Sequence, residues 1–175
     1  MRIAIHIFSI IFFLFCTGFS RIQTSDDTNA HIKATFLYNF TRYIEWPLEL
    51  KKGDFVIAII GNTPLFNELG KVKDATTRGN QIFAINKYLS VKTIEKCHIL
   101  FVAKDQSHKI AEIVKRFKDK PTLIITESPG LIEKGAGINF VIKDNKHGFE
   151  INKGNIAAHG LSMASNLATF ATKVL

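Results

Sequence analysis

The sequence predicts an α/β fold: a mostly parallel central sheet of about six strands, with helices on both faces and an antiparallel hairpin near the C-terminus. Three observations support this prediction. Short apolar runs alternate with amphipathic segments, which favours right-handed crossovers between parallel strands. Several runs are apolar at every position, as in strands that are buried on both faces. Near the C-terminus, two alternating runs are separated by a turn.

Residues 1–20 are typical of a secretory signal. Arg2 precedes an apolar run over residues 3–15, and Gly18-Phe19-Ser20 follows it in a small-x-small pattern. We therefore expect export, with cleavage after Ser20. An uncleaved membrane anchor is the alternative, although the run is shorter than the roughly 20 residues that a spanning helix needs. Cys16 follows a bulky phenylalanine, which argues against a lipid-attachment site.

The remaining chain is long enough for one domain with its own core, and we assign residues 31–175 to that domain. Residues 21–30 are polar and are expected to form a flexible leader. The formal net charge is +8, or about +7 once Arg2 is removed with the signal. A basic balance raises nucleic acid as a partner. Export and the scattered lysines argue against it, so a solvated basic surface that attracts anionic lipid or an acidic protein is preferred.

No catalytic or metal-binding motif is found. Cys97 is the one cysteine left after the signal, so no disulfide forms within the mature chain; a buried thiol is expected, with an intermolecular bridge as the alternative. The histidines are dispersed, and no metal or cofactor is predicted. The loop after the first strand lacks the spacing of a P-loop, and no nucleophile elbow occurs. We predict that the protein is not an enzyme.

The first helix is predicted over residues 33–47, where Pro47 ends it. At 100° per residue one stripe of this helix faces the core, and it consists of Phe36, Leu37, Phe40, Tyr43 and Ile44. Tyr38 lies on the far side of the helix and Trp46 at its flank. Both are therefore candidates for contact with a partner, since aromatic residues are favoured anchors of protein interfaces.

The elements of the sheet follow in order. Buried strands are predicted over residues 55–60, 81–85, 97–103 and 122–126. Thr63-Pro64 is a helix start, residues 107–120 form an amphipathic helix, and Ser128-Pro129 starts another short helix. Residues 138–151 form the hairpin. A long helix is predicted to close the chain, with an apolar stripe of Ile156, Gly160, Met163, Leu167, Phe170, Ala171 and Val174.

Polar side chains follow three of the predicted strands. Ligands of open α/β sheets bind outside the carboxyl ends of the strands, which predicts a crevice for an anionic or aromatic small molecule there. The residues concerned are Asn62, Thr63, Lys104, Asp105, Glu127 and Ser128. The alternative is that Thr63 and Ser128 only cap helices and that the charged residues are ordinary loop residues.

Three segments together resemble the YfiR family. They are KATFLYNFTRYIEWP (33–47), FVIAIIGNTPLFNEL (55–69) and INFVIKDNKHGFEIN (138–152), and the resemblance covers roughly residues 31–172. It implies a periplasmic α/β protein, often dimeric, that binds the periplasmic part of an inner-membrane diguanylate cyclase and holds it inactive. Cyclic di-GMP signalling and biofilm formation would then be restrained. Family members often carry cysteine pairs, and the lone Cys97 argues against a redox switch within the protomer.

The resemblance also implies where a partner binds. The hairpin and the start of the last helix are the expected surface, which here means Phe149, Glu150 and Ile156. The alternative is that Phe149 and Ile156 face the core. The expected partner is a membrane diguanylate cyclase or another inner-membrane sensor, with a homodimer also considered, and membrane contact only through that partner. The second functional hypothesis is a periplasmic small-molecule-binding module that uses the strand-end crevice.

Overall fold

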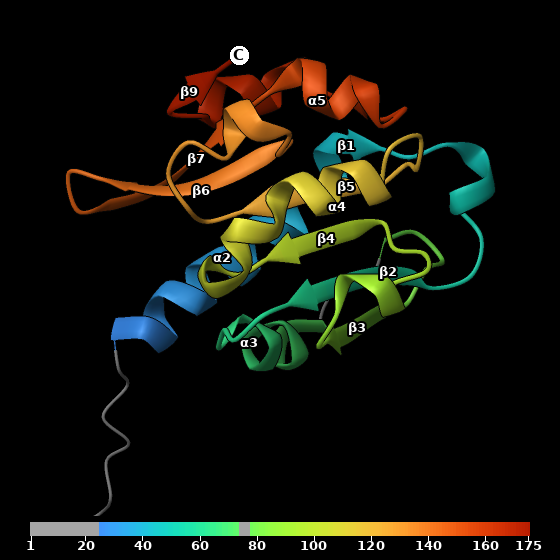
Figure 1. Ribbon diagram of the computed structural model, residues 1–175, viewed down its shortest axis with the longest axis horizontal. Coiled ribbons are helices and arrows are strands. Elements are labelled where there is room, and N and C mark those ends of the chain that lie inside the picture. The colour runs from blue at the N-terminus through green and yellow to red at the C-terminus, as the bar shows by residue number, and fades with distance from the viewer. Residues whose placement is uncertain (1–24, 74–77) are drawn as a thin grey trace, which may run out of the picture.

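In the computed structural model, which describes residues 25–73 and 78–175, seven strands form one sheet in the order β3-β2-β4-β5-β6-β7-β9 (Figure 1). All neighbours are parallel except β6 and β7, which form the antiparallel hairpin. The strands are β2 (Phe55–Ile60), β3 (Phe83–Tyr88), β4 (Ile99–Val102), β5 (Leu123–Thr126), β6 (Ile138–Lys143), β7 (Lys146–Ile151) and β9 (Lys173–Val174). The predicted fold class is confirmed.

Helices cover both faces of this sheet. Figure 1 shows α4 (Ile110–Arg116) in front of the strands and α2 (Ser25–Tyr43) behind them. Because successive residues of a strand point to opposite faces, Ile57 and Ile59 join the core under α2, whereas Ala58 and Ile60 join the core under α4. This is why β2 and β4 are apolar at every position.

The first helix is longer and more deeply buried than expected. It starts at Ser25 and ends at Tyr43, and α3 (Leu65–Val72) packs against it on the same face of the sheet. The expectation that Tyr38 faces outward is therefore wrong. Tyr38 is buried, its hydroxyl donates to the Leu69 carbonyl at 2.8 Å, and its ring meets Phe83 edge-on at 4.9 Å. A second helix covers the side of α2 that periodicity predicts to be exposed.

Trp46 is also buried, contrary to the expectation of an exposed anchor. It follows β1 (Ile44–Glu45), and its indole N–H donates to the His98 carbonyl at 3.1 Å. Its ring meets Phe55 edge-on at 5.0 Å, and the Arg78 guanidinium lies 5.1 Å from its centroid. Trp46 thus closes one end of the core and is not a surface residue.

His98 is a buried neutral side chain in the same cluster. Its Nδ1 accepts from the Val56 N–H at 3.0 Å, so its Nε2 carries the proton and donates to the Leu50 carbonyl at 2.8 Å. Burial of the ring lowers its pKa below the ordinary value of 6.5, and the nearby charges of Lys96 and Arg78 act in the same direction.

This lowered pKa makes the stability depend on pH. Because the unfolded state binds the proton more readily, the stabilisation is complete above about pH 6.5 and is lost as the pH falls through the folded pKa of His98. We expect this group alone to contribute a slope of at most about 1.4 kcal/mol per pH unit. Urea unfolding of the wild type and of His98→Gln between pH 7.5 and 5 would measure it. Parallel stability curves for the two proteins would contradict the assignment.

The long C-terminal helix is not formed. The segment instead contains α5 (Lys153–Ala158), β8 (Ser162–Met163), η6 (Ser165–Phe170) and β9. The Asn152 side chain caps α5 by accepting from the Asn155 N–H, and Gly160 leaves the helix with a φ of 67°. Two strand partners hold β8 and β9 extended on either side of η6, since β8 pairs with β1 and β9 pairs with β7.

Smaller differences concern element ends. The second predicted strand is shifted to Phe83–Tyr88, and a 3-10 turn precedes α4. Ser128-Pro129 forms a turn and no helix, because the short helix starts only at Ile132. The 3-10 segments are η1 (Leu48–Leu50), η3 (Val91–Thr93), η4 (Lys104–Lys109) and η5 (Ile132–Lys134).

The hairpin projects beyond the other strands (Figure 1). Its turn consists of Asp144 and Asn145 with φ values of 51° and 56°, the left-handed geometry of a two-residue hairpin loop. The predicted signal over residues 1–20 lies outside the described residues. Within residues 25–73 and 78–175, no helix has the length and apolar character needed to cross a bilayer.

Candidate functional site

The predicted crevice exists where three strands end. β2, β4 and β5 are parallel neighbours, so the residues that follow them meet at one edge of the sheet. A cavity of about 240 Å³ opens there between the strand ends and α2. Four predicted residues line it, namely Asn62, Thr63, Lys104 and Glu127. Asn29 and Lys33 of α2 complete the wall, and the sequence reasoning missed both because they belong to a distant segment.

The other two predicted residues hold backbone and side chains in place beside this crevice. The Asp105 carboxylate accepts the Asn62 N–H at 3.1 and 3.2 Å. A hydrogen bond from the Gln106 side chain is the main reason that the pKa of Asp105 lies below its ordinary value. Ser128 is buried, and its hydroxyl is 2.6 Å from that of Ser107. Both residues fix the loops that carry the crevice and do not line it.

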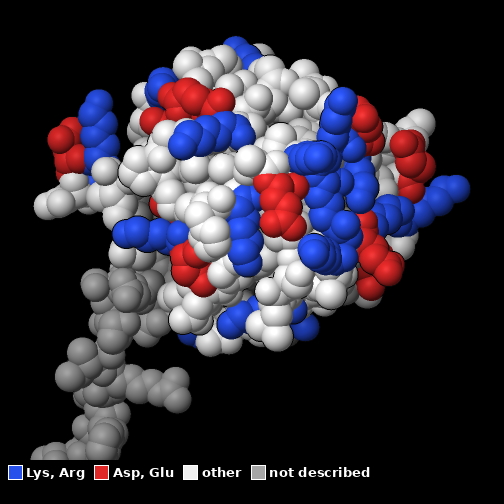
Figure 2. Space-filling model, in the orientation of Figure 1, with Lys and Arg blue, Asp and Glu red and all other residues white. Residues whose placement is uncertain are grey.

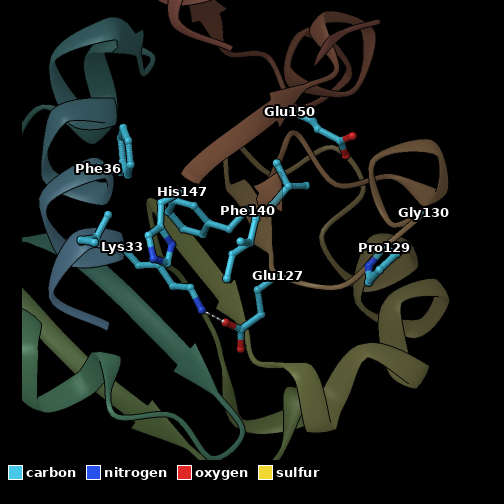
Figure 3. A pocket seen from close by; sticks show the side chains of 11 residues that line it. Lys33, Phe36, Glu127, Pro129, Gly130, Phe140, His147 and Glu150 are labelled. Atoms are coloured by element: carbon cyan, nitrogen blue, oxygen red, sulfur yellow. Dashed lines mark hydrogen bonds and ion pairs between the residues drawn. The ribbon is translucent and has the colours of Figure 1, made fainter. Parts of the chain in front are cut away.

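An ion pair separates the crevice from a second cavity. The Lys33 ammonium contacts the Glu127 carboxylate (Figure 3), and the other oxygen of Glu127 accepts the Lys104 N–H at 2.9 Å. The two side chains are 20% and 11% exposed, so water screens the pair only in part. Lys33 and Glu127 line both cavities. The pair therefore joins α2 to the end of β5 at the centre of the site.

The second cavity measures about 350 Å³ and is mainly apolar. Phe36 of α2 forms one side and Phe140 of β6 forms another (Figure 3), and Ile32 and Ile142 also line it. Polar atoms enter at its margins from Glu127, Glu150 and His147. In the sequence, the aromatic first helix and the alternating hairpin are the features that contribute to this cavity. Neither pattern predicts that the two segments face each other.

Glu150 brings the two predicted sets of residues together. It was expected in a partner surface, and it lines the same cavity as Glu127, which was expected to bind a ligand. Glu150 is half-buried and is fixed by a row of polar side chains across three strands. The Thr126 hydroxyl donates to Asn139 at 2.7 Å, and the Asn139 amide donates to Glu150 at 3.3 Å.

Phe149 and Ile156 face the core, the alternative left open by the sequence. Each is 2% exposed. The Phe149 ring lies 4.9 Å from that of Phe40 and 5.5 Å from that of Phe36, in edge-on contacts. Neither residue offers an exposed anchor to a partner, although one wall of a third cavity includes Phe149.

This third cavity of about 210 Å³ is aromatic. Phe36, Tyr43 and Phe170 line it, together with Phe149 and Leu167. Phe170 is 62% exposed although it is a large apolar side chain. Sequence periodicity predicts that Phe36 and Tyr43 face the core. In the structure they are half-buried and form the wall of an open cavity.

The three cavities follow one side of α2. Their α2 residues include Asn29, Lys33, Phe36, Phe40 and Tyr43, which recur every three or four positions and so share a helix face. We call this line of cavities the α2 groove. It is polar at the strand ends and aromatic near η6. The groove is suited to an extended partner or to a ligand with an apolar body and a polar end.

Basic side chains gather elsewhere. Figure 2 shows them on the α4 face, interspersed with acidic residues. Arg116 of α4 donates to the carbonyls of Lys92 and Ile94, which ties η3 to the helix in this region. The arrangement agrees with a solvated basic surface and adds long-range attraction for anionic partners.

Two features of the described residues bear on metal binding and on the reactivity of Cys97. Among them, no group of three or more His, Cys, Asp or Glu residues is placed to hold a metal ion. Cys97 is buried, and its burial raises the pKa of the thiol to about 12, so it stays protonated and unreactive near neutral pH.

Fold and site together define an α/β protein with a groove along its first helix. The chain matches the family described as YfiR/HmsC-like over residues 30–172 and belongs to that family. The match starts within α2 and ends just before β9, so it includes the whole α2 groove apart from Asn29. No curated protein matches the chain.

Proposed function

We propose that this protein is a periplasmic regulator that binds the periplasmic domain of an inner-membrane diguanylate cyclase and holds the enzyme inactive. The protein itself catalyses no reaction and needs no cofactor. Membership of the YfiR/HmsC-like family over residues 30–172 is the observation that carries this proposal. The predicted secretory signal supports export, after which cleavage near Ser20 releases the domain into the periplasm.

The α2 groove is the surface that we assign to the partner. Aromatic side chains in concave, partly desolvated positions are the usual anchors of an interface, and Phe36, Tyr43 and Phe170 supply them here. Repression then follows from population shift, because a protein that binds only the inactive conformation of a cyclase draws the enzyme into it. A homodimer would be compatible with this role if it leaves the groove open.

The proposal is tested by cellular cyclic di-GMP. Deletion of the gene is expected to raise the cyclic di-GMP content, because the cyclase loses its inhibitor. The full-length gene is expected to restore the lower level, and a version lacking residues 2–20 is not. An unchanged level in the deletion strain, under conditions in which the protein is made, would count against repression.

A variant in the groove separates partner binding from folding. Phe170→Asp places a charge on a side chain that is 62% exposed, so we expect little change in stability and a loss of repression by about tenfold or more. Leu89→Asp is the matched control, because Leu89 is 93% exposed and lines none of the three cavities. Equal repression by both variants would remove the aromatic end of the groove from the interface.

A small-molecule-binding module is the second candidate. The specific observation in its favour is the pair of adjacent cavities of about 240 and 350 Å³ on either side of the Lys33–Glu127 ion pair. Such a ligand would meet the Lys104 and Asn62 side of the crevice with its polar end and Phe36 with its apolar body. A ligand of this kind could also be the signal that a regulator senses, so the two functions are compatible.

A further inference from the structure

We propose that the free edge of β6 receives an added strand: an extended, acidic segment of the regulated partner pairs with Phe140–Lys143 and continues the sheet beyond the end of β5. This inference rests on the proposed function and specifies how the partner is held. Strand addition gives affinity through main-chain hydrogen bonds and specificity through pockets for alternate side chains. Three features of the hairpin support it.

The first feature is the length of β6 relative to its neighbours. β5 pairs with β6 at two positions, Ile125 with Ile138 and Thr126 with Asn139. β7 pairs with β6 along its whole length, as far as Lys143 with Lys146. Beyond Asn139, β6 therefore has β7 as its one strand partner within the described part of the chain, and its opposite edge is open.

The second feature is the direction of the backbone groups. The Asn152 N–H donates to the Gly137 carbonyl at 2.9 Å, which sets the antiparallel alternation so that Asn139 and Val141 also bond toward β7. Phe140 and Ile142 then point the other way. The hydrogen bonds on the far side of β7 show the same alternation. Phe149 lies opposite Phe140, and its carbonyl points away from β6 and accepts from the Thr172 N–H at 2.8 Å.

The third feature is the space beside the edge. The cavity of about 350 Å³ is lined on one side by Phe140, Val141 and Ile142 and on the other by Pro129 and Gly130 (Figure 3). It lies where β5 would run if it continued. Ile142 is 59% exposed there, which is unusual for a large apolar side chain in a strand. An added strand would cover Ile142 and place its own apolar side chains in the cavity.

Charge selects the occupant. Lys143 and Lys146 flank Asp144 at the exposed tip of the hairpin, and the mature chain carries a formal net charge of about +7. Two copies of the chain repel each other at long range, whereas an acidic segment is attracted and oriented. An acidic strand of a partner therefore fits this edge better than a second copy of the protein.

Two variants at position 142 distinguish the contribution of the backbone N–H to partner binding from that of the side chain. Ile142→Pro removes the N–H that points to the free edge and leaves the hydrogen bonds to β7 intact, so the hairpin is expected to persist. Ile142→Ala keeps the N–H and shortens the side chain. Far-UV circular dichroism and a thermal melt of each purified variant check that the fold is kept.

The experiment uses photo-cross-linking in the native cells. A p-benzoylphenylalanine residue replaces Lys143 in the full-length exported protein, and a second strain carries it in place of Leu89 as a control. We expect an adduct with a membrane protein at position 143 and none at 89. The adduct is expected to fall by about tenfold or more with Ile142→Pro and to persist with Ile142→Ala. Pro129→Trp, which fills the cavity from its other wall, is expected to abolish it as well.

The outcomes distinguish this inference from the proposed function. No adduct at position 143, an adduct that survives both Ile142→Pro and Pro129→Trp, or an adduct between two copies of this chain would overturn strand addition at β6. Repression of cyclic di-GMP could still stand in each case. An adduct that depends on the free edge but contains no cyclase would support strand addition and overturn the cyclase as the partner.

Discussion

Replacement of Phe149 with alanine is expected to lower the free energy of unfolding by about 3–5 kcal/mol, the usual cost of truncating a buried phenylalanine. Phe149 is 2% exposed, and its ring makes edge-on contacts with Phe36 and Phe40 of α2. The substitution therefore removes two of the aromatic contacts between the hairpin and the first helix, whereas those of Phe140 with Phe36 and Phe40 remain. Chemical denaturation with urea, followed by circular dichroism, would measure the change.

Phe170→Ala is the matched control for this prediction. Phe170 lies in the same aromatic cavity but is 62% exposed, so its truncation is expected to cost less than about 1 kcal/mol. If Phe149→Ala proved as mild as Phe170→Ala while partner binding was lost, Phe149 would be a contact residue and the packing described above would be wrong.

Gly61→Ala is expected to destabilise the protein by about 2–4 kcal/mol and to distort the strand-end crevice. Gly61 has a φ of 103°, which side chains other than glycine rarely adopt. An added Cβ would also lie 2.4 Å from a carboxylate oxygen of Asp105 and 2.8 Å from the Cβ of Ala103. The displaced Asp105 carboxylate would then lose the hydrogen bond that it accepts from the Asn62 N–H.

Gly53→Ala distinguishes the backbone strain at positive φ from the steric overlap of the added Cβ. Gly53 has a φ of 70°, but a Cβ added to it would meet no atom within 4 Å, so only the backbone strain of about 1–2 kcal/mol is expected there. Thermal melts of both variants provide the comparison. Equal losses of stability would show that the contact with Asp105 and Ala103 relaxes at no cost and that the crevice is softer than its packing implies.

The strand-end crevice shows which part of a site can be predicted from the sequence. Asn62, Lys104 and Glu127 were expected to meet because they follow neighbouring parallel strands, and the topology of such a sheet brings strand ends to one edge. The α2 side of the groove was not expected. Lys33 and Phe36 reach the site only because the first helix lies across the strands that follow much later in the chain.

The first helix shows the limit of periodicity. Its pattern correctly places Leu37 and Phe40 in the core, because a stripe of that width must be buried somewhere. It places Tyr38 outside, since it contains no information about α3, which covers the second side. Conversely, Phe36 and Tyr43 are only half-buried, because no further element covers the groove above them within the described residues.

By itself, the sequence determined the alternation of strands and helices, the mostly parallel sheet and the hairpin, since these depend on local patterns of apolar residues. Tertiary structure alone decided the end of the chain. Its residues have the spacing of a helix, but β1 and β7 offer open edges, and pairing with them keeps Ser162–Met163 and Lys173–Val174 extended. Local periodicity contains no information about hydrogen-bonding groups presented by strands far away in the chain. For the same reason, the free edge of β6 could not be predicted from the sequence, because it exists only where β6 continues beyond the end of β5.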